Sequence, residues 1–376
     1  MKTKLLFIYG PLGGGGAERV LIDILNNLDK SKYDADLCLI VNQGILLSEV
    51  PSNITIIPLW KSYNSYYKLA YRLSKWGISD YLFKRVLSKK LKKKYDVEIS
   101  FLEGMPAKLH GMTKSSGKKI SWVHCDLYNF PYEKQLYSKG DDLKTYNSMD
   151  RIVCVSKDAL GAFSKRFPDC KTPIEVIYNP IDISKILKKS HQEIEVNNKH
   201  SLTVITVGRL TLQKRIDRII RLAKRMKLEQ ENIHFQIIGD GELKEELLLL
   251  RKKLDVEDYV SFKGFVNNPY PYIADADIML LPSGYEGFGL VVCEAMALGI
   301  PVISTKTAGP TEIIDNNRYG LLCNHDDHSI YDAVMKMYRL EQMRQEYSDL
   351  GRQRAEDFSV HHTMESLYAL INRLVM

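Results

Sequence analysis

The stretch Ile278–Ala297, with the sequence IMLLPSGYEGFGLVVCEAMA, gives the clearest indication of the fold. Four apolar residues come first, a loop containing Gly287 and Gly289 follows, and an apolar run begins near Leu290. A short apolar run, a tight glycine loop and a helix-length segment in this order predict one strand–loop–helix unit of a parallel α/β sheet. In such sheets the loops that follow the strands bind ligands.

The same alternation runs through most of the chain, with short apolar runs between longer amphipathic segments. It predicts two similar, doubly wound, Rossmann-like α/β domains around a cleft. The predicted strands are Leu5–Tyr9, Leu37–Val41, Ile54–Pro58, Val97–Phe101, Lys119–Val123, Ile152–Val155, Ile174–Ile177, Leu202–Val207, Phe235–Ile238, Val260–Lys263, Ile278–Leu281, Val302–Ser304 and Tyr319–Cys323. The predicted helices include Ala17–Leu28, Lys157–Phe167, Arg215–Met226 and one long helix over Ile330–Tyr347.

A polar stretch interrupts this alternation near the middle of the chain and predicts a linker. We therefore assign residues 1–182 to an N-terminal domain, 183–200 to the linker and 201–357 to a C-terminal domain. Residues 358–376 are predicted to form a final helix.

The bulk composition is that of a globular protein. The 376 residues are 45% hydrophobic and 26% charged, with a net charge of +7, and this length suits two cores. Six scattered cysteines without any C-x-x-C pair favour buried thiols in a reducing compartment over disulfides or a zinc site. No signal peptide or membrane-spanning run is apparent, so we expect a cytoplasmic protein.

A glycine-rich loop, Gly10–Gly16, follows the first predicted strand. Its last glycines (Gly14, Gly15 and Gly16) let a backbone approach a ligand closely just before a helix N-terminus, and we expect them to contact a phosphate or a sugar. Glu18 stands where a dinucleotide-binding fingerprint has its third glycine, which disfavours a dinucleotide oxidoreductase. The alternative is a flexible turn that only reverses the chain.

Two cations follow the first strand of the second domain. Arg209 comes directly after Leu202–Val207, and Lys214 opens the next helix. A guanidinium fork and an ammonium group together suit a diphosphate. Cations at a helix start oppose the helix dipole, so an anionic ligand is favoured over two merely solvated side chains.

Two glutamates occupy the opening stretch, Glu286 in its loop and Glu294 one turn inside its helix. The N–H groups around Gly289 and Leu290 can hold phosphate oxygens. Glu294 lies in an otherwise apolar run, where a carboxylate needs hydrogen-bond donors, and ribose or sugar hydroxyls would supply them. Backbone amides of its own domain are the alternative donors.

Taken in order along the chain, these motifs resemble those of the GT4 family of retaining glycosyltransferases, which have the GT-B fold. Glu286 and Glu294 reproduce the family's E-x7-E motif, and the resemblance covers nearly the whole chain. The other matching segments are Gly14–Arg19, Val176–Asp182, Gly208–Leu210 with Lys214, Ile238–Glu242, Gly299–Ile303 and Gly309–Glu312.

The resemblance implies a role for each candidate residue. Arg209 and Lys214 would bind the donor diphosphate and stabilise the leaving group. Glu286 would hold hydroxyls of the donor sugar, and Glu294 would hold the nucleotide ribose. His124, after a predicted strand of the first domain, is similar to the family's histidine that reaches the donor sugar, although a lone histidine is more often structural.

The resemblance also implies the reaction. We expect transfer of a hexosyl or N-acetylhexosaminyl group from a nucleotide sugar, with UDP as the expectation from the family, to a saccharide or lipid-linked saccharide, as in cell-surface polysaccharide synthesis. The final helix would cross back to the first domain. The leaving diphosphate can accept the acceptor's proton, so the protein need supply only alignment and charge.

No cofactor and no catalytic metal are expected. Asp275 and Asp277 form a D-x-D pattern, but they are predicted to be a helix end and a strand start rather than metal ligands. Two other functions remain open: a nucleotide-sugar epimerase, and a non-catalytic module that binds nucleotide sugars.

Residues 63–95 are dense in tyrosine, lysine and arginine, and end in the basic run Lys84–Lys94. An amphipathic helix of this kind suits an anionic membrane surface, which a lipid-linked acceptor would make useful. The protein would then sit at the inner face of the cell membrane. A solvated helix face is an equal alternative, and no nucleic-acid motif accompanies the charges.

Overall fold

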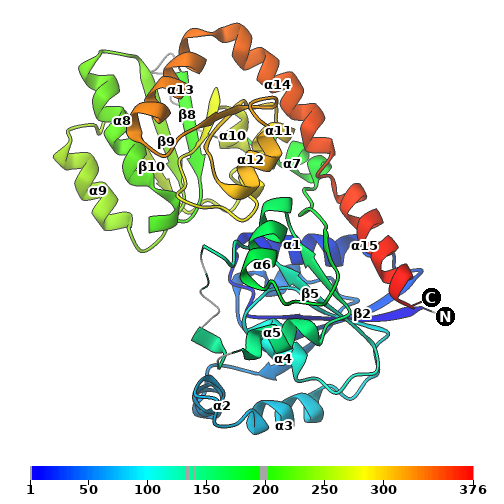
Figure 1. Cartoon of the computed structure of the whole chain (residues 1–376). Helices are drawn as coiled ribbons and strands as arrows, with labels where there is room; N and C mark the ends of the chain where they lie inside the picture. Colours follow the sequence, from blue (N-terminus) through cyan, green and yellow to red (C-terminus); the bar gives the residue numbers. More distant parts are fainter. Residues whose placement is uncertain (1, 130, 132–134, 139, 195–201, 376) are drawn as a thin grey trace. The chain divides into compact units, whose positions relative to one another are not determined.

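The protein was studied as a computed structural model that describes residues 2–129, 131, 135–138, 140–194 and 202–375. It divides into two compact units: unit 1 is Met1–Pro180 with Val360–Met376, and unit 2 is Ile181–Ser359. Each unit is a parallel sheet with helices on both faces (Figure 1). The prediction of two doubly wound α/β domains is confirmed.

The sheet of unit 1 has the order β3-β2-β1-β4-β5-β6-β7 in the described part of the chain, and every pair is parallel. The chain runs outward from β1 in one direction and then returns to start again at β4, so the strand order reverses between these two strands. The strands are β1 (Thr3–Tyr9), β2 (Tyr33–Val41), β3 (Thr55–Trp60), β4 (Val97–Ser100), β5 (Lys118–Val123), β6 (Arg151–Cys154) and β7 (Ile174–Val176).

Unit 2 repeats this plan with the order β10-β9-β8-β11-β12-β13, and its reversal lies between β8 and β11. Its described strands are β8 (Leu202–Val207), β9 (Ile233–Ile238), β10 (Val260–Gly264), β11 (Ile278–Leu281), β12 (Val302–Thr305) and β13 (Leu321–Cys323). Apolar side chains of the strands are buried on both faces, because helices cover both sides of a parallel sheet.

The helices follow the strands in alternation. Those of unit 1 are α1 (Gly16–Asn27), α2 (Ser65–Lys75), α3 (Tyr81–Lys90), α4 (Met105–Gly111), α5 (Asp141–Asn147), α6 (Lys157–Arg166) and α15 (Val360–Val375). Those of unit 2 are α7 (Ile183–Ser190), α8 (Ile216–Leu228), α9 (Lys244–Lys253), α10 (Tyr270–Ala274), α11 (Leu290–Ala297), α12 (Ala308–Ile314), α13 (Asp327–Arg339) and α14 (Glu341–Glu356). None of the described helices is long and apolar enough to cross a membrane.

The expected linker is partly a packed helix. Residues 183–200 are predicted from the sequence to be a linker, but Ile183–Ser190 forms α7, with Ile186 buried. The Asn268 side-chain amide, just before α10, donates a hydrogen bond of 2.9 Å to the Lys189 carbonyl. The polar composition of this stretch hid a helix with a narrow apolar face. Residues 195–200 of the predicted linker lie outside the described residues.

Two further predicted helices are each broken into a pair. The helix expected over Ile330–Tyr347 becomes α13 and α14, because Leu340 between them leaves the helical region at φ −110° and ψ 84°. The basic segment 63–95 forms α2 and α3, separated by a turn in which Gly77 has φ +68°. A positive φ of this size suits glycine and ends the first helix.

The final helix α15 packs within unit 1, as its contacts with α1 indicate. The Tyr368 ring stacks on Tyr33 with 4.9 Å between ring centroids, and the Tyr368 hydroxyl accepts a hydrogen bond from the Asp29 backbone N–H. Unit 1 is therefore built from both ends of the chain.

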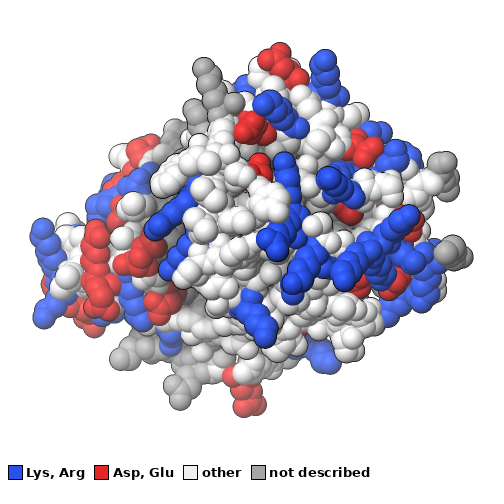
Figure 2. Space-filling view, turned by 90° about the horizontal axis from the view of Figure 1, so that it is seen from below, with Lys and Arg blue, Asp and Glu red and all other residues white. Residues whose placement is uncertain are grey.

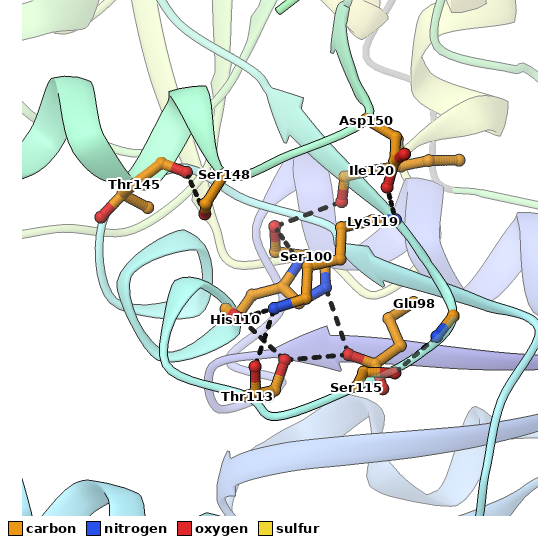
Figure 3. Close-up of polar contacts among 11 residues, drawn as sticks. Glu98, Ser100, His110, Thr113, Ser115, Lys119, Ile120, Thr145, Ser148 and Asp150 are labelled. Carbon is orange, nitrogen blue, oxygen red and sulfur yellow. Dashed lines mark hydrogen bonds and ion pairs between the residues drawn. The ribbon is translucent and has the colours of Figure 1, made fainter.

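A buried polar network joins β4, α4 and β5 in unit 1 (Figure 3). The His110 ring, with no exposed surface, has Nδ1 3.0 Å from Ser100 Oγ and Nε2 3.4 Å from Glu98 Oε2. Lys119 Nζ donates to the carbonyl oxygens of His110 and Thr113, which closes the C-terminal end of α4. Burial lowers the pKa of His110, so the imidazole is neutral near pH 7.

Candidate functional site

The sequence-predicted residues of unit 2 gather where the strand order of its sheet reverses. β8 and β11 are neighbours, and their carboxyl ends lead into two loops, Gly208–Lys214 and Pro282–Gly289. In open α/β sheets a ligand site forms at this reversal, because the two chain directions diverge there and leave a crevice. Arg209 and Lys214 lie on the first loop and Glu286 on the second.

The loop after β8 is shaped by close backbone packing. The Gly208 N–H donates to the Ile238 carbonyl at the end of β9. A Cβ on Gly239, whose φ is +143°, would lie 1.9 Å from the Gly208 oxygen, so this approach requires glycine. Leu210 points into the core, and Arg209 beside it is exposed, with no hydrogen-bond or ion-pair partner for its side chain among the described residues.

Lys214 and Glu286, which are 72 residues apart, form an ion pair with 2.6 Å between Nζ and Oε1. The Ser283 hydroxyl also donates to Glu286 Oε1, at 2.6 Å. Side-chain exposures of 18% for Lys214 and 8% for Glu286 leave water little access to the pair. Both donors bind Oε1, so within the described part of the chain Oε2 is left to accept a hydrogen bond from a ligand.

Hydrogen bonds from buried side chains hold the loop that carries Glu286 in place. Thr305 Oγ1 donates to the Ser283 carbonyl at 2.6 Å, and the nearly buried Arg218 donates to the Pro282 carbonyl at 2.7 Å. Across the crevice, the Gly284 N–H donates to the Gln213 carbonyl at 2.8 Å. These bonds hold the two loops in one geometry before any ligand binds, which is the arrangement that electrostatic catalysis requires.

The contributions of Ser283 and Arg218 were not predicted from the sequence. Ser283 lies inside the quoted loop, three residues before Glu286, but nothing in the sequence reveals that its hydroxyl faces that carboxylate. The position of Arg218 could have been noticed in the sequence. It stands four residues before the apolar Leu222, so on a helix the two side chains lie on the same face, and that face of α8 is buried.

The N-terminus of α11 lies at the end of the same loop. Gly289 precedes the helix in the left-handed region, at φ +89° and ψ 54°, and no side chain caps the helix. Leu290 is its first residue. Gly309 of α12 packs against the loop so closely that a Cβ there would lie 2.1 Å from the Phe288 oxygen. The predicted anion-binding position is therefore an uncapped helix start.

Glu294 lies one turn further along α11 and is half-buried. The Tyr270 hydroxyl, from α10, donates to Glu294 Oε1 at 3.0 Å. Part of the hydrogen bonding of this carboxylate is therefore supplied by the protein, through a tyrosine the sequence analysis did not single out.

In unit 1, the glycine loop follows β1 and His124 follows β5. The strand order of this sheet reverses between β1 and β4, and β5 is the next strand after β4. Gly14 has φ +99°, Gly15 is the N-cap of α1, and Gly16 is its first residue. Glu103, after β4, is 2% exposed and accepts a 2.7 Å hydrogen bond from the His124 backbone N–H. The loops after β1, β4 and β5 thus bring polar groups to one edge of this sheet.

The His124 imidazole is held neutral. Burial lowers its pKa to about 4, against the smaller opposing effects of the Glu103 carboxylate and a hydrogen bond to the Phe101 backbone. The Phe101 ring lies 4.9 Å from the imidazole, centroid to centroid. Its Nε2 atom is buried and has no hydrogen-bond partner among the residues that the structure describes. A neutral ring with one unused nitrogen can bind a hydroxyl group.

The D-x-D pattern has structural partners. Asp275 is the C-cap of α10, and Asp277 Oδ2 accepts a 2.7 Å hydrogen bond from the Thr203 N–H at the start of β8. These positions agree with the helix end and strand start predicted from the sequence.

Comparisons with known proteins place the chain among glycosyltransferases. The family model described as Glycosyltransferase Family 4 matches residues 14–185, and the model for Glycosyl transferases group 1 matches residues 188–354. A relative from Campylobacter jejuni, an N-acetylgalactosamine-N,N'-diacetylbacillosaminyl-diphospho-undecaprenol 4-alpha-N-acetylgalactosaminyltransferase, is 30% identical over 371 residues, which covers 95% of this chain and 96% of the relative.

Solved structures share the fold at lower identity. HepE of Anabaena in complex with UDP has a TM-score of 0.78 at 20% identity and covers all of both chains. Sucrose-phosphate synthase of Thermosynechococcus elongatus has a TM-score of 0.80 at 16% identity, over 99% of each chain. The two-domain architecture is therefore that of GT-B glycosyltransferases.

Proposed function

We propose that this chain, which belongs to glycosyltransferase family 4, moves a sugar from a nucleotide-sugar donor to a saccharide or lipid-linked saccharide and retains the anomeric configuration. The observation that carries the proposal is the end of the unit 2 sheet where its strand order reverses. One loop there carries Lys214 and also Arg209, whose guanidinium has no partner among the described residues, and the other carries Glu286 and leads into the uncapped start of α11. Cations and helix N–H groups suit the diphosphate, and a carboxylate with one free oxygen suits sugar hydroxyls.

The donor we propose is a UDP-sugar carrying a hexosyl or N-acetylhexosaminyl group. HepE has been solved with UDP and with UDP-glucose, and the Campylobacter relative is named as an N-acetylgalactosaminyltransferase. The named relatives include enzymes whose acceptors are diphospho-undecaprenol saccharides. These names support a lipid-linked acceptor and a place at the inner face of the cell membrane, with residues 63–95 toward anionic lipid.

In the proposed mechanism the protein supplies alignment and charge rather than a nucleophile. Arg209 and Lys214 stabilise the negative charge that develops on the leaving diphosphate as the sugar–oxygen bond breaks. The departing phosphate oxygen accepts the proton of the acceptor hydroxyl on the same face, which retains the configuration. Glu286 fixes the donor sugar, Glu294 fixes the ribose, and the neutral His124 imidazole contacts the donor sugar.

We also propose that no metal takes part, because two cationic side chains already face the diphosphate position. Activity in the presence of excess EDTA tests this point. Full activity after chelation supports the proposal, whereas loss of activity that Mg²⁺ or Mn²⁺ restores contradicts it.

A panel of labelled UDP-, GDP- and ADP-sugars, each with and without a lipid-linked saccharide acceptor, tests the proposed function. A transferase releases nucleotide mainly when acceptor is present and labels the acceptor. An epimerase changes the sugar without any acceptor, and a binding module does neither. Either of the last two results would overturn the proposal.

A further inference from the structure

The positive charge of the chain is concentrated in one segment of unit 1. Residues 61–94 contain eleven lysines and arginines and a single acidic residue, Asp80, so the segment carries +10 while the whole chain carries +7. The rest of the chain is therefore slightly acidic. A local excess of this size creates a strongly positive surface in a protein of modest net charge.

α2 has apolar side chains on two faces. Its inner face packs into the core of unit 1, where the Tyr67 ring lies 5.2 Å from Trp60 and 6.3 Å from Phe83, centroid to centroid. Its outer face carries a second stripe at helical spacing, the exposed Tyr66, Leu69 and Trp76 with the partly exposed Leu73, and no helix or strand in the described part of unit 1 covers it. Leu69 is 50% exposed and Trp76 67%.

This stripe continues into the turn between α2 and α3. Ile78 and Tyr81 are each 63% exposed. The turn is held in place, because the Ser74 hydroxyl donates to Asp80 Oδ1 at 2.5 Å and the Trp76 N–H donates to the Arg72 carbonyl. Asp80, the only acidic side chain of residues 61–94, thus stabilises the turn by accepting a hydrogen bond. The turn in turn holds the exposed side chains of Ile78 and Tyr81 in place.

Cations surround this apolar turn. Figure 2 looks at the molecule from below, the side of α2 and α3, and shows lysine and arginine side chains gathered beside a broad uncharged area. The exposed cations of the two helices are Lys68, Arg72, Lys75, Lys84, Arg85, Lys89 and Lys90. The basic run beyond α3 contributes less, because Lys93 Nζ is paired with Asp34 and Asp36 at 3.1 Å each.

We infer that α2, α3 and the turn between them form a membrane-contact surface, in which Trp76, Ile78 and Tyr81 enter the headgroup region of an anionic bilayer. Tryptophan and tyrosine favour that depth, and the neighbouring cations bind lipid phosphates. The proposed function gives this surface its purpose, since a lipid-linked acceptor lies in the same bilayer. Aromatic, aliphatic and cationic side chains together, with almost no acid, favour an anionic bilayer over a protein partner with mixed charge.

The tryptophans make the test direct. Of the three in the chain, Trp60 and Trp122 are buried and only Trp76 is exposed. Vesicles of phosphatidylglycerol and phosphatidylcholine should therefore shift the fluorescence emission of the full-length protein to shorter wavelength, and the protein should sediment with them. The double variant Trp76→Glu, Ile78→Glu should lose at least about tenfold in vesicle affinity.

Leu249→Glu is the control for an added carboxylate, because Leu249 is 69% exposed on α9 of unit 2; it gains one negative charge, against the two that the double variant gains. It should bind vesicles as the unaltered protein does. Both variants should unfold at the same temperature as the unaltered protein and should keep its rate of nucleotide release with a water-soluble acceptor. That rate reports on the proposed function separately from membrane binding.

Three results would overturn the inference. The first is equal vesicle binding by the double variant and the unaltered protein. The second is equal binding to anionic vesicles and to vesicles of phosphatidylcholine alone. The third is a protein that self-associates in the absence of lipid and becomes monomeric in the double variant, since the turn would then be a contact between copies of the chain.

Discussion

At the scale of single residues, the Glu286 carboxylate is the centre of the site. Its Oε1 atom accepts from both Lys214 and Ser283 at 2.6 Å, in a position with little access to water. A buried charge with two donors is stable in place, and removing either donor leaves it partly uncompensated. Glu286 is thus oriented before the donor binds, and Lys214 has further N–H donors for a phosphate.

The Lys214→Ala variant tests the role of the ammonium group. We expect kcat to fall by a factor of about 100 to 1,000, because one charge that stabilises the leaving diphosphate is lost. Lys227→Ala is the control, since Lys227 lies on α8 but pairs with Asp255 away from the crevice. Steady-state kinetics measure both variants. Unchanged kcat in a folded Lys214→Ala protein would show that the diphosphate lies elsewhere.

The Ser283→Ala variant tests the second donor. We expect kcat/KM for the donor to fall about tenfold, because one hydrogen bond to a carboxylate contributes about 1.5 kcal/mol or more. Ser304→Ala removes another buried hydroxyl, whose partners among the described residues are backbone carbonyls on β12 and β11. If both serine variants lose the same activity, the effect comes from general destabilisation and Ser283 does not position Glu286.

At the scale of elements, the loop before α11 depends on α12. The loop is short, rich in glycine and flanked by β11 and α11, but its position is set by Gly309 at the start of α12. The backbone of that glycine contacts the Phe288 backbone without space for a side chain. α12 therefore supports the loop that carries Glu286.

Gly309→Ala should disturb this support. The added methyl group would meet the Phe288 carbonyl, so we expect a loss of about 1–3 kcal/mol in stability and weaker binding of UDP by calorimetry. Gly161→Ala in α6 is the control, because a Cβ there meets nothing within 4 Å and alanine favours a helix. UDP affinity that is unaffected by Gly309→Ala would mean that the loop does not hold the nucleotide.

At the scale of the whole molecule, the unfolding of unit 1 can be followed separately by tryptophan fluorescence, because all three tryptophans lie in that unit. Unit 1 also contains two histidines of lowered pKa, the buried His110 and the partly buried His124. In Glu98, burial acts to raise the carboxyl pKa, but the neighbouring His110, Thr113 and Ser115 lower it overall. Each of these three groups makes unit 1 sensitive to acid.

Stability of unit 1 should therefore fall as the pH drops below about 6.5. An unfolded histidine takes up a proton near pH 6.5, whereas folded His124 does so only near pH 4, so the proton favours the unfolded state in between. For His124 alone the loss is about 2 kcal/mol at pH 5. Glu98 adds a further loss below its unfolded value near 4.5, because protonation removes a carboxylate that the fold stabilises.

Urea unfolding followed by tryptophan fluorescence at pH 7.5 and pH 5 measures this difference. The His124→Phe variant should show a smaller loss between the two pH values, since its side chain cannot be protonated. Equal stability of the unaltered protein at both pH values would contradict the assignment of neutral, buried histidines.

Much of the fold could be predicted because the relevant physics is local. Apolar runs such as Leu202–Val207 and Ile278–Leu281 give the strands, since a strand buried on both faces must be apolar throughout. Candidate site residues were predictable where they follow such strands, as Arg209, Glu286 and His124 do. Breaks within amphipathic segments, such as Leu340 and the turn at Gly77, were missed because the apolar pattern continues across them.

The two parallel sheets, and the polar and glycine-rich loops that follow their strands, could thus be predicted from local patterns in the sequence. The folded structure was needed to show that Lys214 and Ser283 share one oxygen of Glu286, and that no described helix or strand covers the outer face of α2. Strand and helix patterns depend on neighbours within a few residues. The Lys214–Glu286 contact instead spans 72 residues, and it exists only after β8 has paired with β11, from which β9 and β10 separate it along the chain.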